Sequence, residues 1–177
     1  MRIRPATAAD LSNILKLIHL KAEFDGCPEA VEATSEALNA TLFAANPMAY
    51  ILLAESKTQS TTPVAATHSL PVGFASYHFT YSTFLAQPSL WLDDIFIKET
   101  HRNCGLGAEL IRTLCQIALK HNCGRVDWTV DKQNQAGIRF YQRIGGQLQT
   151  QVHLCRLNRS AIDKMAISTV PAHHARQ

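Results

Sequence analysis

Two glycines that follow an apolar strand and open an amphipathic helix constrain this chain more than any other feature of its sequence. The strand is expected over 90–97, and the helix begins beside Gly105 and Gly107. The apolar residues of the helix recur at helical spacing and mark one buried face: Leu106, Leu110, Ile111, Leu114 and Ala118. A strand joined to a helix by a glycine-rich turn predicts a fold in which helices pack against a sheet.

Hydrophobic periodicity along the rest of the chain extends this interpretation. Strands are expected at 3–6, 50–54, 72–81, 126–130 and 147–157. Helices are expected at 8–23, 30–45 and 134–144, with a short helix near Ile162. The order β-α-α-β-β-β-α-β-α-β predicts an α+β fold with a mixed sheet, because consecutive strands favour antiparallel pairing and a β-α-β unit favours parallel pairing.

Length and composition predict one ordered domain over residues 1–177. The chain has 177 residues, of which 46% are hydrophobic and 18% are charged, enough to build a sizeable core. The polar loop at about 56–70 and the tail at about 167–177 are expected to be mobile.

Charge and hydropathy argue against several classes of partner. The net charge is only +3 and no basic run is present, so neither nucleic acid nor a membrane surface is expected as a partner. The sequence contains no apolar stretch of membrane-spanning length and no signal-peptide pattern at its start, which predicts a cytoplasmic location. The five cysteines lack C-x-x-C spacing and the eight histidines lack ligand spacing, so no metal is expected.

The turn before the long helix has the composition of an anion site. Glycines allow close approach to the backbone, and the first N–H groups of a helix have no partner within the helix. Arg102 adds a full positive charge. A plain strand-to-helix turn is one alternative, and a dinucleotide-binding G-x-G-x-x-G motif is another. Leu110 stands where that motif needs its third glycine, although Asp127 lies about 20 residues further on, as the motif requires.

These residues resemble the GNAT family of N-acetyltransferases. The pattern Arg102-x-x-Gly105-x-Gly107 is similar to that family's acetyl-CoA pyrophosphate loop, and Asn134 followed by Phe140-Tyr141 is similar to its second cofactor helix. Almost the whole chain resembles the diamine (spermidine/spermine) and thialysine acetyltransferases of that family, apart from 56–70 and the tail. The resemblance implies a sheet of six to seven strands flanked by about four helices. The matching stretches are 3–10, 79–83, 92–97, 138–141 and 157–165.

The resemblance implies acetyl-CoA as cosubstrate and transfer of its acetyl group to an amine by direct attack in a ternary complex. Asn134 is expected on the pantetheine arm, or else merely as a helix cap. A backbone N–H near Ile95 is expected to polarise the thioester carbonyl. The full set of expected cofactor contacts is Ile95, Phe96, Ile97, Arg102, Asn103, Cys104, Gly105, Leu106, Gly107, Ala108, Asn134 and Tyr141.

The resemblance implies that two side chains are catalytic. An alkylamine has a pKa of about 10.4 and must lose a proton before it attacks. Asp93 is expected to pass that proton to water, and Tyr141 to protonate the departing thiolate. A solvated Asp93 and a Tyr141 in the core are the alternatives. Strict alternation over 90–97 places Leu92, Asp94 and Phe96 on one face and Asp93 on the other.

The resemblance also implies a small primary amine as acceptor, either a lysine-like or thialysine-like amino acid or a diamine or polyamine. The expected contacts are Phe24, Asp25, Ser82, Thr83 and Asp93. A homodimer is expected from the resemblance. Two alternatives stay open: a non-catalytic CoA-binding sensor or interaction module, and an acetyltransferase that acts on protein lysines.

Overall fold

A computed structural model describes residues 2–57 and 69–167 of the chain. The chain divides after Asn134 into two compact units. A single acetyltransferase domain over residues 1–177 stays a prediction. Most of the predicted loop at 56–70 and almost all of the tail at 167–177 lie outside the described residues. Within the described ranges, no helix combines the length and the apolar character that crossing a bilayer requires.

The first unit follows the predicted order of elements. Its helices are α1 (Leu11–Asp25), α2 (Ser35–Leu42) and α3 (Leu106–Lys120). Its strands are β1 (Arg2–Pro5), β2 (Tyr50–Lys57), β3 (Ser69–Ser82), β4 (Gln87–Ile97) and β5 (Val126–Trp128). The second unit contains α4 (Gln135–Arg143) and α5 (Arg159–Ile167).

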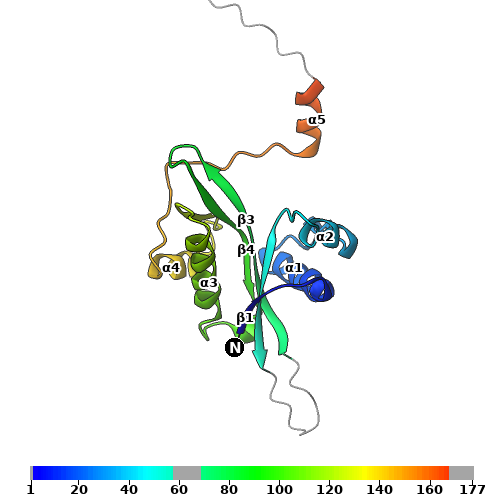
Figure 1. Cartoon of the computed structure of the whole chain (residues 1–177), viewed down its shortest axis with the longest axis vertical. Coiled ribbons are helices and arrows are strands. Elements are labelled where there is room, and N and C mark those ends of the chain that lie inside the picture. The colour runs from blue at the N-terminus through cyan, green and yellow to red at the C-terminus, as the bar shows by residue number, and fades with distance from the viewer. Residues whose placement is uncertain (1, 58–68, 168–177) are drawn as a thin grey trace, which may run out of the picture. The chain divides into compact units, whose positions relative to one another are not determined.

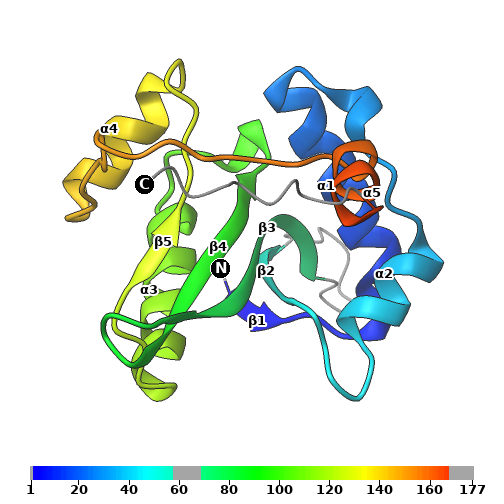
Figure 2. The ribbon, with the colours of Figure 1, turned by 90° about the horizontal axis from the view of Figure 1, so that it is seen from above.

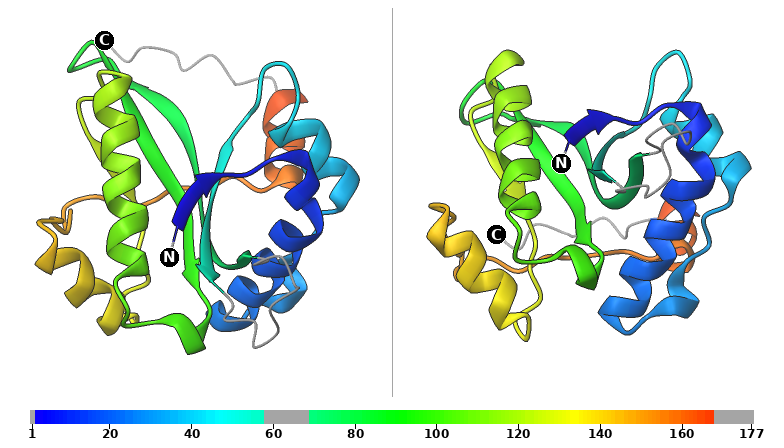
Figure 3. Two further views of the ribbon diagram at one scale, coloured as in Figure 1. Left: turned by 60° about the horizontal axis from the view of Figure 1, so that its bottom comes forward. Right: turned by 90° about the horizontal axis from the view of Figure 1, so that it is seen from below.

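The sheet is mixed, as the order of elements predicted. Its strands lie in the order β1-β2-β3-β4-β5, with antiparallel pairs from β1 to β4 and a parallel pair between β4 and β5. The helix α3 connects the two parallel strands. Figure 3 shows α1 and α3 on opposite faces of the sheet.

The expected count of six to seven strands is not confirmed, because the described residues form a sheet of five. The strand predicted at 147–157 is absent, and that segment has no regular secondary structure. A strand depends on a neighbour for its backbone hydrogen bonds, and the outermost strand β5 is only three residues long. Alternating apolar residues alone therefore did not create a sixth strand.

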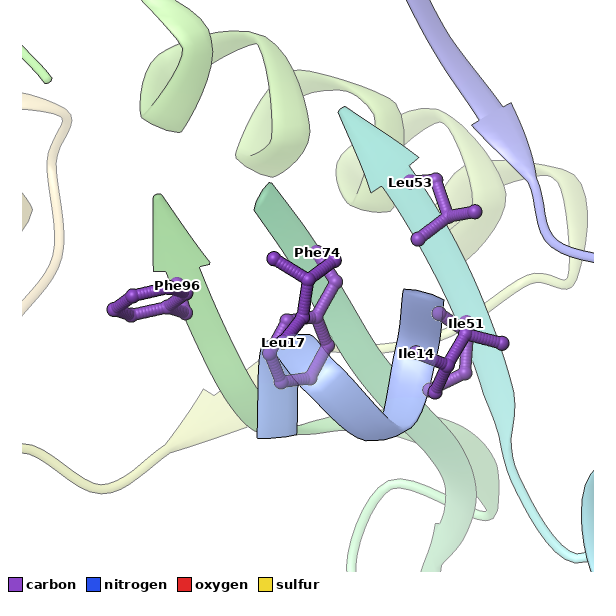
Figure 4. Packing of buried hydrophobic residues seen from close by; sticks show 6 residues of the cluster. All are labelled: Ile14, Leu17, Ile51, Leu53, Phe74 and Phe96. Carbon is purple, nitrogen blue, oxygen red and sulfur yellow. The ribbon is translucent and has the colours of Figure 1, made fainter. Parts of the chain in front are cut away.

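One core layer lies between α1 and the sheet. Ile14 and Leu17 of α1 are almost fully buried against the inner residues of three strands (Figure 4). These sheet residues are Ile51, Leu53, Phe74 and Phe96. Their burial fixes α1 over the sheet and so fixes where its C-terminal end lies, since each such side chain contributes about 1.5–3 kcal/mol.

A charged cluster ties the N-terminal strand to the start of α1. The guanidinium of Arg4 donates to the Asp10 carboxylate at 2.8 Å and to the Glu55 carboxylate at 2.6 Å. The Thr7 N–H donates to Asp10 at 2.8 Å. Asp10 and Glu55 are both buried, and the hydrogen bond from Arg4 holds the pKa of Asp10 well below its usual range.

Candidate active site

A β-bulge at Asp93 interrupts β4. Ser76 of β3 lies opposite Asp94 and Tyr77 lies opposite Leu92, so Asp93 is an extra residue without a partner. The Asp94 N–H donates to the Ser76 hydroxyl at 3.0 Å. The bulge keeps each half of β4 aligned with β3 but changes which residues share a face.

The prediction that Leu92 and Asp94 share a face is therefore wrong. Residues that lie opposite each other on paired strands point to the same side of the sheet. Asp94 shares a side with Ser76 and with Phe74 of the α1 core layer, whereas Leu92 shares the other side with Tyr77. Phe96 lies on the α1 side with Asp94, as predicted. Asp93 itself is exposed.

Beyond the bulge, β4 has an open edge. The pairing with β5 covers only Leu90 to Leu92, and β4 then continues past the end of β5 (Figure 2). The stretch 93–97 pairs with β3 on one side, and the described residues place no strand on its other side. Main-chain donors and acceptors at such an edge can bind an extended ligand in the manner of an added strand. The expected cofactor contacts Ile95, Phe96 and Ile97 lie here.

The turn that follows β4 is exposed and leads directly into the first turn of α3. Gly105 caps α3 with a left-handed φ of 87° and is exposed, as are Asn103 and Cys104. Leu106, Gly107 and Ala108 form the first turn of α3, whose N–H groups have no acceptor within the helix. The positive end of the helix dipole lies at the same place. These features fit a diphosphate group.

The thiol of Cys104 makes a hydrogen bond within this turn. Its Sγ–H donates to the His101 carbonyl at 2.7 Å. The thiol is therefore turned back onto its own loop.

Arg102 extends from this turn toward the end of α1. Its guanidinium carbon lies 4.4 Å from the centroid of the Phe24 ring and 5.8 Å from that of Phe96. Its Nε–H donates to the Ile97 carbonyl at 2.9 Å. Both aromatic rings face a cation, an arrangement worth about 0.5–2 kcal/mol. The predicted cofactor turn and the predicted amine pocket are thus in direct contact.

The C-terminal end of α1 carries the acidic half of the site. The helix ends where the Cys27 N–H donates to the Ala22 carbonyl at 2.9 Å, which places Asp25 at the last turn. The ammonium of Lys21 bonds to the Asp25 carboxylate and lies 3.3 Å from Asp94. Burial raises the pKa of Asp94, and the positive charge of Lys21 opposes that shift.

Two predicted substrate residues lie away from this cluster. Ser82 is buried at the end of β3, where its hydroxyl accepts the Leu85 N–H at 3.3 Å. It follows Ser76, the partner of Asp94, by six residues, or about 20 Å of strand. Figure 1 shows this long hairpin of β3 and β4. The structure therefore does not bring Ser82 and Thr83 beside Asp25.

Asn134 and Tyr141 stand at and beyond the boundary between the two units. The Asn134 N–H donates to the Asp131 carbonyl at 3.0 Å, just before α4 begins. Tyr141 lies in α4, with its ring 5.2 Å from that of Phe140. Its carbonyl accepts the Gly146 N–H at 2.8 Å, which closes the helix at the predicted glycines. The roles expected for Asn134 and Tyr141 stay predictions.

Sequence reasoning missed the part that Lys21 plays and left Asp94 unassigned. The spacing of Lys21 and Asp25, four residues apart, is a known signal for a helical ion pair. The predicted helix stopped at residue 23 and so hid this pair. The contact with Asp94 depends on the bulge, which no pattern in the sequence reveals.

Comparison with known proteins identifies the fold and the family. Residues 17–146 match the acetyltransferase (GNAT) family. An integron cassette protein from the mobile metagenome of V. cholerae has the same fold, with a TM-score of 0.72 and 23% identity over 94% of this chain and 98% of its own.

Two curated relatives are similar over most of this chain. Human spermidine/spermine N(1)-acetyltransferase-like protein 1 is 34% identical over 168 residues, which is 93% of this chain but 24% of the human protein. Mouse thialysine N-epsilon-acetyltransferase is 31% identical over 150 residues, 85% of this chain and 86% of the mouse protein. The chain belongs to the acetyltransferase (GNAT) family. It is an enzyme of the GNAT acetyltransferase type.

Proposed function

We propose that this enzyme transfers an acetyl group from acetyl-CoA to a small primary amine by direct attack in a ternary complex. The observation that carries the proposal is the meeting of three features in the first unit: the open edge of β4, the exposed N-terminus of α3 and the acidic end of α1. The names of the relatives, which include a thialysine and a spermidine/spermine-type acetyltransferase, support an amine as acceptor.

The turn and the strand edge would hold acetyl-CoA. Main-chain N–H groups of 103–108 would bind the diphosphate, and the edge of β4 at 95–97 would bind the pantetheine arm. Asn134 and Tyr141 would complete this set. When bound, the cosubstrate supplies an acetyl thioester.

The chain's own residues would move two protons around the transfer. Asp93, exposed at the bulge, would hold a water molecule that accepts the proton of the substrate ammonium. A main-chain N–H near Ile95 would hydrogen-bond to the carbonyl oxygen as the amine nitrogen attacks and the carbon–sulfur bond breaks. Tyr141 would supply a proton to the departing thiolate and so release the free thiol, since a phenol is protonated at neutral pH.

The test is release of free thiol from acetyl-CoA in the presence of lysine, thialysine, diamines, polyamines and lysine-containing peptides. Turnover on a small amine supports the proposal. Turnover on peptides alone indicates a protein-lysine acetyltransferase. Tight binding of acetyl-CoA without turnover on any acceptor indicates the non-catalytic sensor and contradicts the proposal.

Three broader expectations also belong to the proposal. The chain would act as one domain over residues 1–177, as a homodimer and in the cytoplasm. Light scattering coupled to gel filtration measures the dimer, and cell fractionation measures the location. A monomer with full activity would contradict the expected assembly.

A further inference from the structure

A lysine of the chain already occupies the acidic end of α1. Lys21 contacts two carboxylates, Asp25 on the next helical turn and Asp94 on β4. Its side chain is only 20% exposed, whereas those of Asp25 and Asp94 are 39% and 36% exposed. Lys21 is thus the most enclosed of the three charged side chains, yet it keeps some contact with solvent.

Two independent elements position this cation. The i,i+4 spacing within α1 places Lys21 beside Asp25, and the Asp93 bulge turns Asp94 toward α1. Burial disfavours the charge on Lys21, but its hydrogen bond to Asp25 and the attraction of Asp94 outweigh burial and raise its pKa. Lys21 is therefore a permanent ammonium at neutral pH.

This placement matters for any substrate that carries a second charge. A diamine or polyamine needs a carboxylate for the ammonium that does not react. Lys21 neutralises one of the two carboxylate charges that it contacts, so the cluster attracts a second cation less strongly than Asp25 and Asp94 alone would. An ω-amino acid differs because its far end carries a carboxylate beside its ammonium. An ammonium has three N–H donors, so Lys21 can donate to that carboxylate while it keeps its contacts with Asp25 and Asp94.

We infer that Lys21 is a specificity-determining residue, an internal counter-cation that selects ω-amino acids over diamines and polyamines. The inference rests on the proposed amine acetylation and names its substrate class. Lys21 carries out no chemical step; it sets the charge that the unreactive end of the substrate meets.

The test compares lysine with 1,5-diaminopentane, which differs from lysine only by the α-carboxylate. The enzyme should acetylate lysine with the higher kcat/KM. Lys21→Met removes the charge at similar side-chain length. The kcat/KM for lysine divided by the kcat/KM for 1,5-diaminopentane should then fall by about tenfold. Lys21→Arg keeps the charge and should retain the preference for lysine. Lys16→Met makes the same change at an exposed position of α1 and should leave the ratio unchanged.

A binding measurement separates this inference from the proposed function. Calorimetry should show tighter binding of 1,5-diaminopentane to Lys21→Met than to the wild-type enzyme, whether or not turnover occurs. Failure of the wild type to acetylate any amine would contradict the proposed function alone. An unchanged diamine affinity and an unchanged ratio in folded Lys21→Met would overturn the role of Lys21. If Lys21→Met does not fold, Lys21→Gln provides the same comparison with hydrogen-bonding capacity retained.

Discussion

The guanidinium of Arg102 lies 4.4 Å from the centre of the Phe24 ring. Arg102 belongs to the turn that would hold a diphosphate, and Phe24 lies in the last turn of α1, at the end of the site that would receive the amine. A hydrogen bond from the Arg102 Nε–H to the Ile97 carbonyl also helps to position the guanidinium. Any change at Arg102 therefore acts on both halves of the site.

Arg102→Lys should weaken both cosubstrate and amine binding. Lysine keeps the charge but lacks the planar group that covers Phe24 and reaches the Ile97 carbonyl. Loss of the stacked cation should raise the KM for amine and for acetyl-CoA each by about 2- to 10-fold, as steady-state kinetics would measure. Arg112→Lys, on the exposed surface of α3, is the matched control. A rise in only one KM would show that the two halves are independent.

Substitutions at Gly105 should separate backbone strain from blocking of the ligand. The left-handed φ of 87° at Gly105 strains a valine far more than an asparagine. A Cβ added at this position meets no atom within 4 Å, so any loss of stability comes from the backbone and not from a clash. Gly105→Val should lower thermal stability, and Gly105→Asn should largely keep it. Calorimetry should show that both lose CoA affinity by about tenfold or more, because each side chain obstructs the exposed N–H groups. Unchanged affinity in Gly105→Asn would show that the turn is misassigned.

Tyr141→Phe should lower kcat while leaving CoA affinity nearly unchanged. The substitution removes only the hydroxyl, so the ring contact with Phe140 persists. Loss of a general acid should reduce kcat by about 10²- to 10⁴-fold. Phe140→Leu changes the neighbouring ring instead and controls for packing. If Tyr141→Phe lowered CoA affinity and thermal stability along with kcat, the hydroxyl would have a structural role.

The Arg4–Asp10 pair should make stability depend on acid pH. Because the folded state holds the pKa of Asp10 below its unfolded value of about 3.9, the pair stabilises the fold fully above that pH. This contribution disappears as the pH falls through the folded pKa. Asp10→Asn should therefore lower the free energy of unfolding by about 1–3 kcal/mol at pH 7.

Urea denaturation at several pH values measures this effect. The difference between the wild type and Asp10→Asn should shrink steadily below pH of about 4. Asp163→Asn, which removes an exposed pair with Arg159 on α5, should show little difference at any pH. If the difference in the free energy of unfolding between the wild type and Asp10→Asn stayed constant down to a pH of about 2, the assigned ion pair would be contradicted.

The sequence predicted the elements better than it predicted how they pair. Helical spacing located α1 and α3, because an amphipathic face leaves a long and regular signal. The glycine turn was predictable because a left-handed residue at a helix start strongly favours Gly105. The strand at 147–157 was wrong because apolar alternation says nothing about whether a neighbouring strand is long enough to pair.

The acidic part of the candidate site was the least predictable. Alternation placed Asp94 on the same face as Leu92, and only the register of β4 against β3 corrects this. Phe24 and Asp25 were singled out, but Lys21 was not, although it contacts Asp25 directly. Contacts between elements distant in sequence depend on three-dimensional packing that local patterns do not encode.

The extra residue in β4 implies a constraint on chain length that is separate from any constraint on side-chain chemistry. A chain shortened by one residue at position 93 would join Leu92 directly to Asp94, so that one half of β4 would have to shift its register against β3 or turn its side chains to the opposite face. Many residue types could stand at this position and preserve the bulge, but a deletion would remove it.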